Sequence, residues 1–195
     1  MTRRATAERT TAETDVAVTL DLDGTGEGRI ATGIGFLDHL LTSFAHHGMF
    51  DLQVATTGDL EVDDHHTAED TALVLGRAVA EALGDRSGIN RFGDAAVPMD
   101  EAVATAVVDA GGRPFAVIDL PFATDRLGTL STQNIPHLLE AFCREAGITL
   151  HLSASGSNDH HVAEAAFKAL ARALRAAVAA DPRRGGVPST KGTTS

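Results

Sequence analysis

The chain has 195 residues, enough for one domain or for two small halves fused into one. Its formal net charge of −11 argues against non-specific nucleic-acid binding, which needs a basic surface. No apolar run approaches the roughly 18 residues of a membrane span, and no apolar stretch near the N-terminus marks a secretory signal. The single cysteine, Cys143, excludes an internal disulfide. Its apolar helical surroundings fit an inert side chain in a reducing cytoplasm.

Hydrophobic periodicity predicts a mixture of strands and helices in the first half of the chain. Alternation at period two predicts a strand over 15–22, and the turn residues after it allow 28–32 to return as its hairpin partner. Apolar residues at helical spacing predict a helix over 36–47, with Gly48 as its C-cap. The remaining elements of this half are a strand over 50–54 and a helix over 65–83 that Gly84 stops.

The second half repeats this order, which indicates an internal duplication. The His-Leu-Leu run that begins at His39 matches the run that begins at His137, and the stretch from Glu13 aligns with the stretch from Glu101. The expected fold is therefore α+β, a single domain of two β-β-α-β-α pseudo-repeats with helices backing the sheets. The pseudo-repeats span about 9–92 and 93–192, and the second is predicted to hold strands over 101–109, 114–119 and 148–153 and helices over 133–146 and 160–180.

Both halves carry the same metal-binding signature. Residues 64–70 read DHHTAED and residues 159–164 read DHHVAE, and each run opens a helical pattern. On a helix, His65 and Glu69 share a face one turn apart, and so do the corresponding residues of the second motif. Adjacent residues diverge by about 100° around a helix axis, so two neighbouring histidines more naturally serve two ions, one each.

The number of candidate ligands indicates an open site that holds two metals. Six histidines and two glutamates give four ligands for each ion. An octahedral ion such as Mn²⁺ would then keep two positions for substrate or water, whereas Zn²⁺ usually closes at four ligands in a structural site. The ligand types alone do not choose among Mn, Fe, Co, Ni and Zn. The candidates are His39, His65, His66, Glu69, His137, His160, His161 and Glu164.

Other charged residues near the motifs have simpler expected roles. Asp63, Asp64 and Asp159 are predicted to cap the two helices, with direct metal ligation as the alternative, and Asp70 is expected to orient a histidine. The C-terminal run 182–192 is basic and glycine-rich in an otherwise acidic chain. This run either frays or wraps around an anionic group.

Motifs along nearly the whole chain, from about residue 9 to 192, resemble those of the imidazoleglycerol-phosphate dehydratases of histidine biosynthesis. The resemblance is to the monofunctional form, because no phosphatase domain accompanies the motifs. The departures are mild, such as Phe115 where a tyrosine is expected. The motifs are FLDH at 36–39, DDHHTAED at 63–70, GINRFG at 88–93, PMDEA at 98–102, GRPF at 112–115, NDHHVAEAAFKA at 158–169 and PSTKG at 188–192.

This resemblance implies a fold of two ribosomal-protein-S5-like halves and two Mn²⁺ ions per active site. It also implies a cytoplasmic 24-subunit assembly, in which neighbouring subunits complete each site. One metal would take His39, His66, Glu69 and His161, and the other would take His65, His137, His160 and Glu164. The implied substrate-binding residues are Glu13, His39, His47, His65, Glu69, Arg91, Arg113, His160, Lys168, Ser189 and Lys191, of which Arg91, Arg113, Ser189 and Lys191 would hold a phosphate with Lys168 close by.

The family reaction removes water from D-erythro-imidazole glycerol phosphate and gives imidazole acetol phosphate. The proton that is lost is not beside a carbonyl, so electrons of the imidazole ring must expel the hydroxyl. The expected route is a metal-stabilised imidazolate that passes through a diazafulvene. Glu13, His47 and Glu164 are the expected catalytic residues, with Glu13 as acid or base. The alternatives are a solvent-facing strand charge for Glu13 and a surface histidine for His47.

Two other functions fit the same ligands. Structural ions could cement a metal-storage or assembly protein, and a dinuclear metal site could hydrolyse phosphoesters. Only the phosphoesterase would release phosphate. In each case the expected partners are small molecules or further copies of the chain, with no nucleic acid and no membrane.

Overall fold

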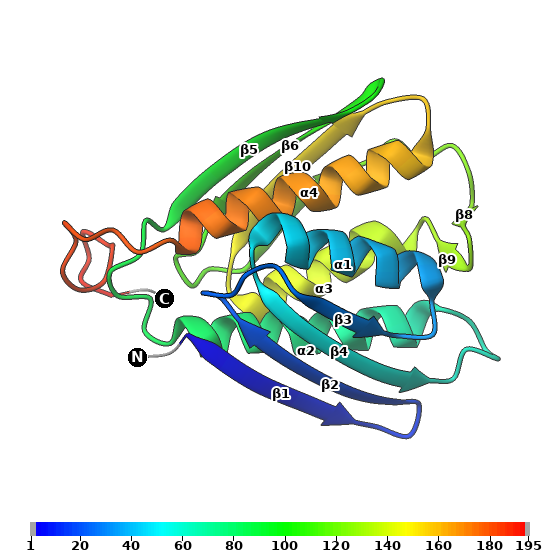
Figure 1. Cartoon of the computed structure of the whole chain (residues 1–195), viewed down its shortest axis with the longest axis horizontal. Coiled ribbons are helices and arrows are strands. Elements are labelled where there is room, and N and C mark those ends of the chain that lie inside the picture. Colours follow the sequence, from blue (N-terminus) through cyan, green and yellow to red (C-terminus); the bar gives the residue numbers. More distant parts are fainter. Residues whose placement is uncertain (1–2, 194–195) are drawn as a thin grey trace.

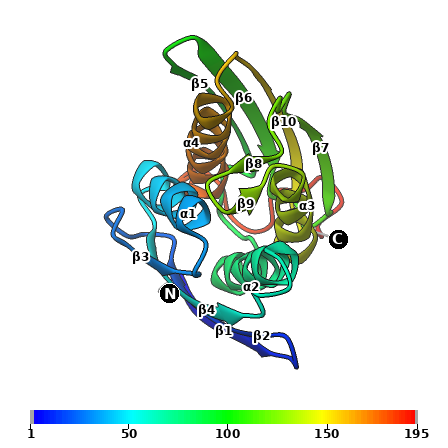
Figure 2. The ribbon, with the colours of Figure 1, turned by 90° about the vertical axis from the view of Figure 1, so that its right-hand side faces the viewer.

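Two four-stranded sheets enclose a double layer of helices in the computed structural model, which describes residues 3–193 (Figures 1 and 2). Helices α1 (Gly35–Gly48) and α2 (His65–Leu83) pack on the first sheet, and α3 (Asn134–Ala146) and α4 (Asp159–Val178) pack on the second. The two helix layers meet where α1 packs on α4 and α2 packs on α3. The predicted α+β class is confirmed. No helix within the described residues is long and apolar enough to cross a membrane.

The two halves share one sheet topology. The first sheet has the order β1-β2-β4-β3 and the second has β5-β6-β10-β7, so each strand has a counterpart at the same place. This match agrees with the predicted duplication, although each half opens with one strand more than predicted, β1 or β5. The strands are β1 (Arg4–Thr10), β2 (Thr14–Asp21), β3 (Gly28–Ala31), β4 (Asp51–Gly58), β5 (Phe92–Met99), β6 (Ala102–Asp109), β7 (Phe115–Asp119), β10 (Thr149–Ser155) and a short ribbon of β8 (Arg126–Leu127) and β9 (Leu130–Ser131).

The prediction that 28–32 forms a hairpin with the preceding strand is wrong. β3 pairs in parallel with β4, while β2 lies antiparallel between β1 and β4. Parallel neighbours need a crossover connection, and α1 supplies it. The loop before β3 is fixed at the start of β4, because Oδ1 of Asp51 accepts hydrogen bonds from the backbone N–H groups of Thr25 and Glu27 at 2.7 and 3.1 Å.

The glycines that were predicted to end helices behave differently in α1 and α2. Gly84 ends α2 with a φ of 55°, as predicted. The predicted cap at Gly48 is wrong, because Gly48 is the last residue of α1 and Met49 takes the left-handed conformation with a φ of 58°. Glycine is needed at position 48 for a different reason, since a Cβ there would collide with the ring of Phe50.

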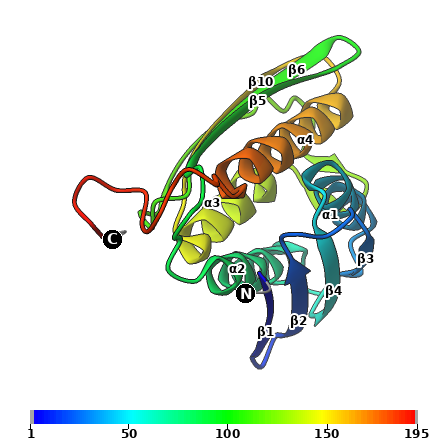
Figure 3. The same ribbon diagram turned by 60° about the vertical axis from the view of Figure 1, so that its left-hand side comes forward.

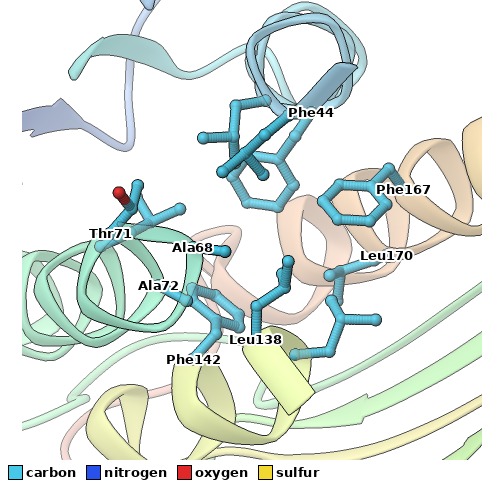
Figure 4. Close-up of a pocket in the computed structure, with 12 residues that line it drawn as sticks. Phe44, Ala68, Thr71, Ala72, Leu138, Phe142, Phe167 and Leu170 are labelled. Atoms are coloured by element: carbon cyan, nitrogen blue, oxygen red, sulfur yellow. The ribbon is translucent and has the colours of Figure 1, made fainter. Parts of the chain in front are cut away.

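Apolar side chains from all four helices meet at the centre of the molecule (Figure 4). The rings of Phe44, Phe142 and Phe167 face this centre, and each is at most 3% exposed. Helices α2 and α3 approach closely at Gly76, where a Cβ would lie 2.5 Å from the carbonyl oxygen of Phe142. Cys143 is buried, and this burial raises the pKa of its thiol to about 12, which fits the predicted inert side chain.

Candidate metal and substrate site

The first group of metal-binding side chains joins the start of α4 to α1. Nε2 of His39 and Nε2 of His160 lie 3.0 and 2.9 Å from Oε1 of Glu164, which is only 7% exposed. Burial tends to raise the pKa of Glu164, but hydrogen bonds from Lys168, His39 and His160 outweigh it and lower this pKa to about 2. The ring of Phe36 packs beside both histidines. The carboxylate is thus held ionised among nitrogen donors.

The second group is the counterpart of the first and joins α2 to α3. Oxygens of Glu69 lie 3.7 Å from Nε2 of His65 and 3.4 Å from Nε2 of His137. The two imidazole rings stack with centroids 4.8 Å apart. Oδ1 of Asn134 contacts Nδ1 of His65 at 3.2 Å, which leaves Nε2 directed to the glutamate. Each group therefore takes one helix from each half of the chain.

The second histidine of each motif points away from these groups. The ring planes of the two adjacent pairs are nearly perpendicular, at 85° and 87°, and the second histidine of each pair has a different carboxylate partner from the first. Nδ1 of His66 lies 3.0 Å from Oδ2 of Asp59, whose hydrogen bond raises the pKa of this histidine. Nδ1 of His161 lies 2.7 Å from Oε2 of Glu101; this bond raises the pKa of His161 and lowers that of Glu101 to about 2.

The residues present fit divalent metal ions. Three sets of side chains each place histidine nitrogens and carboxylate oxygens within 4.8 Å of one another. Imidazole and carboxylate donors together suit first-row divalent metals. One chain does not assemble either of the four-ligand sets given above. Each set takes members from both of the first two groups, and His66 and His161 lie outside these groups. The three sets are His39, His160 and Glu164; His65, Glu69 and His137; and Glu13, Asp59 and His66.

Asp59 belongs to one of these sets and was missed by the sequence analysis. It follows β4 directly, and its backbone N–H donates to the carbonyl of Glu13 at 3.1 Å. Its side-chain contact with His66 spans seven residues in a loop, a spacing that matches neither helical nor strand periodicity. The only signal in the sequence was an additional acid shortly before the histidine pair.

The aspartates of the two motifs do not all cap helices as predicted. Asp63 does accept the N–H of His65, at 2.8 Å, but Asn158 rather than Asp159 caps α4. The carboxylate of Asp159 instead accepts bonds from residues 123 and 124, and that of Asp64 accepts bonds from residues 131 and 134. Both aspartates are buried and anchor the connection between β7 and α3.

The expected role of Asp70 as a partner of a histidine is wrong. Its carboxylate accepts a hydrogen bond from the hydroxyl of Thr14 and pairs with Nε of Arg9 at 3.1 Å. These contacts join α2 to the β1–β2 hairpin. Asp70 therefore ties the helix to the sheet, at the hairpin that carries Glu13.

The basic residues with a predicted phosphate role gather in one pocket of about 160 Å³. Arg91, Arg113, Ser189 and Lys191 line it. Nε and Nη2 of Arg91 hold Asp109 at 2.7 and 2.9 Å, and its Nη1 donates to the carbonyl of Pro188, so Arg91 fixes the C-terminal segment. The side chain of Arg113 is 68% exposed, and its Nη2 lies 3.6 Å from Oδ2 of Asp109.

Lys168 and His47 lie elsewhere. Nζ of Lys168 is 2.6 Å from Oε2 of Glu164, so this lysine belongs to the first metal-binding group and does not line the basic pocket. His47 lies near the end of α1, where burial lowers its pKa and the charges of His46 and Lys168 lower it further. Glu13 is 55% exposed, beside His66.

The metal-binding groups and the basic pocket lie at opposite ends of the molecule. All four helices begin at the right of Figure 1, where β8 and β9 also lie, while the C-terminal segment lies at the left (Figures 1 and 3). The backbone N–H of Arg91 donates to the carbonyl of Ala177 near the end of α4. At about 1.5 Å per residue, Ala177 lies about 25 Å along α4 from His160.

Comparisons with known proteins identify the family of the chain. Residues 32–174 match the family model described as imidazoleglycerol-phosphate dehydratase. The dehydratase of Methanoculleus marisnigri is 56% identical over 191 residues, which cover 98% of this chain and 99% of the relative. That of Chloroflexus aggregans is 56% identical over 192 residues, which cover 97% and 94%.

Two crystal structures of such dehydratases share the fold. The Staphylococcus aureus enzyme has a TM-score of 0.82 at 34% identity, over 91% of this chain and 99% of that one. The Pyrococcus furiosus enzyme, solved with a bound ligand, has a TM-score of 0.82 at 36% identity, over 95% and 99%. The chain therefore belongs to the imidazoleglycerol-phosphate dehydratase family, the hydro-lyases of histidine biosynthesis.

Proposed function

We propose that this chain dehydrates imidazole glycerol phosphate to imidazole acetol phosphate at a site with two Mn²⁺ ions. The observation that carries the proposal is the pair of matching groups, each with two histidines and one glutamate, in a chain of this family. The proposed ligands are the eight residues named from the sequence, His39, His65, His66, Glu69, His137, His160, His161 and Glu164. Bound metal would supply Lewis acidity that stabilises negative charge on an imidazole ring.

A complete site would need more than one subunit. The basic pocket and the metal-binding groups of one chain lie at opposite ends of α4, which rises about 25 Å between His160 and Ala177, whereas the substrate spans roughly 10 Å from ring to phosphate. His66 and His161 also point away from both groups, as donors to a neighbouring chain would. These features support sites that are completed between subunits, and we propose that the subunits form the 24-subunit assembly expected from the family resemblance. The matching strand orders of the two sheets support one domain of two pseudo-repeats, and we propose that it works in the cytoplasm.

The chain's own residues would bind the substrate and move protons. Arg113 and Lys191 would hold the phosphate, with Arg91 and Ser189 fixing the loop. The exposed carboxylate of Glu13 would take the proton from the carbon chain, because its solvent-facing position gives it access to substrate. His47 would remain neutral through its lowered pKa and so be able to accept a proton.

The decisive experiment is removal and return of metal. Chelation is expected to reduce formation of the ketone product to below about 1%, and Mn²⁺ is expected to restore it, because the reaction needs the metal's Lewis acidity. Product would be followed directly with imidazole glycerol phosphate as substrate. Phosphate release would instead favour a phosphoesterase. Metal-dependent assembly without any product would favour the storage or assembly protein.

Arg113→Gln is expected to raise KM by about 10- to 100-fold with kcat nearly unchanged. The substitution removes a charge-assisted hydrogen bond to phosphate, worth about 1.5–3 kcal/mol, far from the reacting carbon. Steady-state kinetics would measure both constants. The matched control is Arg183→Gln, since Arg183 is 89% exposed in the C-terminal segment but does not line the pocket. A fall in kcat at constant KM would contradict the phosphate role.

A further inference from the structure

The carboxylates that hold His66 and His161 come from different places in the two halves. Asp59, in the loop after β4, holds Nδ1 of His66 at 3.0 Å. Glu101, in the turn between β5 and β6, holds Nδ1 of His161 at 2.7 Å. The two histidines are themselves counterparts in the duplicated motifs. In both halves a carboxylate therefore holds the second histidine of the motif, but the carboxylate comes from a different loop in each half.

The register of the sheets identifies the counterpart of each carboxylate. β2 begins directly after Glu13, and β6 begins directly after Glu101, so these glutamates correspond. Leu52 of β4 lies opposite Leu20, and Leu150 of β10 lies opposite Val108, a shift of 98 residues between β4 and β10. The same shift places Asp59 in correspondence with Ser157.

Because Asp59 and not Glu13 holds His66, the corresponding glutamates Glu13 and Glu101 have different contacts. In the second half, Oε1 of Glu101 accepts the N–H groups of Ser157 and Asn158 at 3.2 and 2.8 Å, while Oε2 holds His161. Both of its oxygens are therefore occupied. In the first half, the nearest oxygen of Glu13 is 3.7 Å from Nδ1 of His66, beyond hydrogen-bond distance. Asp59 has taken over that contact.

We propose that Asp59 and Glu101 are the positioning residues of His66 and His161, and that Asp59 thereby frees Glu13 to act on substrate. A histidine that donates its Nδ1 proton to a carboxylate keeps the lone pair of Nε2 for a metal. The nearest acidic oxygen to Nε2 of His161 is that of Asp100, at 3.9 Å, so this nitrogen is not held by it. The proposal rests on the proposed function, in which both histidines bind Mn²⁺.

The test measures Mn²⁺ binding to the full chain. The readout is the electron paramagnetic resonance signal of the Mn²⁺ that remains free in solution. Asp59→Asn and Glu101→Gln are each expected to weaken binding of one ion by about 10- to 100-fold. Glu13→Gln is expected to bind Mn²⁺ within about 2-fold of the unchanged chain while kcat falls. The matched control is Glu81→Gln, an exposed glutamate on α2 that should change neither quantity.

A double variant separates positioning from local folding. Ser157→Asp added to Glu101→Gln copies the arrangement of the first half into the second, and it is expected to restore Mn²⁺ affinity to within about 3-fold. If the Mn²⁺ affinity of the double variant does not recover, the positioning role of Glu101 is wrong, because Glu101 would then act only by holding the loop before α4.

His66→Ala separates a failure of the proposed ligand set from a failure of the proposed positioning role. Unchanged Mn²⁺ binding in His66→Ala would refute the ligand set of the proposed function. Loss of Mn²⁺ in His66→Ala with unchanged affinity in Asp59→Asn and Glu101→Gln would overturn only the positioning role.

Discussion

Glu164→Gln is expected to reduce kcat by at least about a thousandfold and to lower bound Mn²⁺ from two ions to one per chain. Glu164 is the one anionic side chain of its group, and hydrogen bonds from Lys168, His39 and His160 hold its pKa at about 2 despite burial. Glutamine keeps the size of the side chain but removes the negative charge that a metal ligand supplies. It also removes the carboxylate that pairs with the half-buried Lys168, which costs further stability.

Turnover with substrate and metal content per chain are the two measurements. Glu140→Gln provides the matched control, since Glu140 is an exposed glutamate of α3 outside every metal-binding set. Full metal content in Glu164→Gln would remove Glu164 from the ligand set, even if activity fell. Normal activity in that variant would refute the proposed site as a whole.

Phe167→Ala is expected to lower the free energy of unfolding by about 3–5 kcal/mol. The ring is 2% exposed and faces the apolar space where the four helices meet (Figure 4). Its removal would enlarge that space at the contact of the two layers, where neither sheet can move in to fill it. Urea unfolding followed by circular dichroism would measure the change.

Phe115→Ala makes the same deletion where the ring is 62% exposed, on the outer face of the second sheet. We expect it to cost no more than about 1 kcal/mol. Equal losses of unfolding free energy in the two variants would mean that the packing between the helix layers stabilises the fold no more than the exposed ring of Phe115 does.

The elements that were predicted correctly are those whose residues carry a local periodic signal. The helices that open at the paired histidines have apolar residues at helical spacing and a clear end at Gly84. β1 was missed because Ala7 is its only buried apolar side chain, and β5 because its alternation is weak and includes Pro98. These two strands are specified by the neighbours they pair with, which a local pattern does not contain.

The connectivity of the sheet was harder to predict than its strands. Turn residues after Asp21 suggested a hairpin, yet the next strand, β3, pairs with β4 on the side of β4 that faces away from β2. That choice is made by α1, whose apolar face must be covered and which therefore carries the chain across the sheet.

In the candidate site, too, some residues could be predicted from the sequence and others could not. The pattern of histidines and glutamates was sufficient to name residues that the fold brings together, including His39 and His137 from outside the paired motifs. Asp59 and the anchoring role of Asp64 could not be read from the sequence. Their partners lie in other loops, and a short acidic side chain before a helix has a helix cap as its simplest interpretation.

The connection between β7 and α3 is held from both sides by Asp64 and Asp159, one from each copy of the motif. It contains the β8–β9 ribbon, which has no counterpart in the described part of the first half. A half cut from the chain would lose either this connection or one of its anchors, and each buried aspartate without its donors would cost about 1–3 kcal/mol. The two copies have thus ceased to be exchangeable modules. A substitution at either aspartate would loosen the same connection, so the two motifs depend on each other.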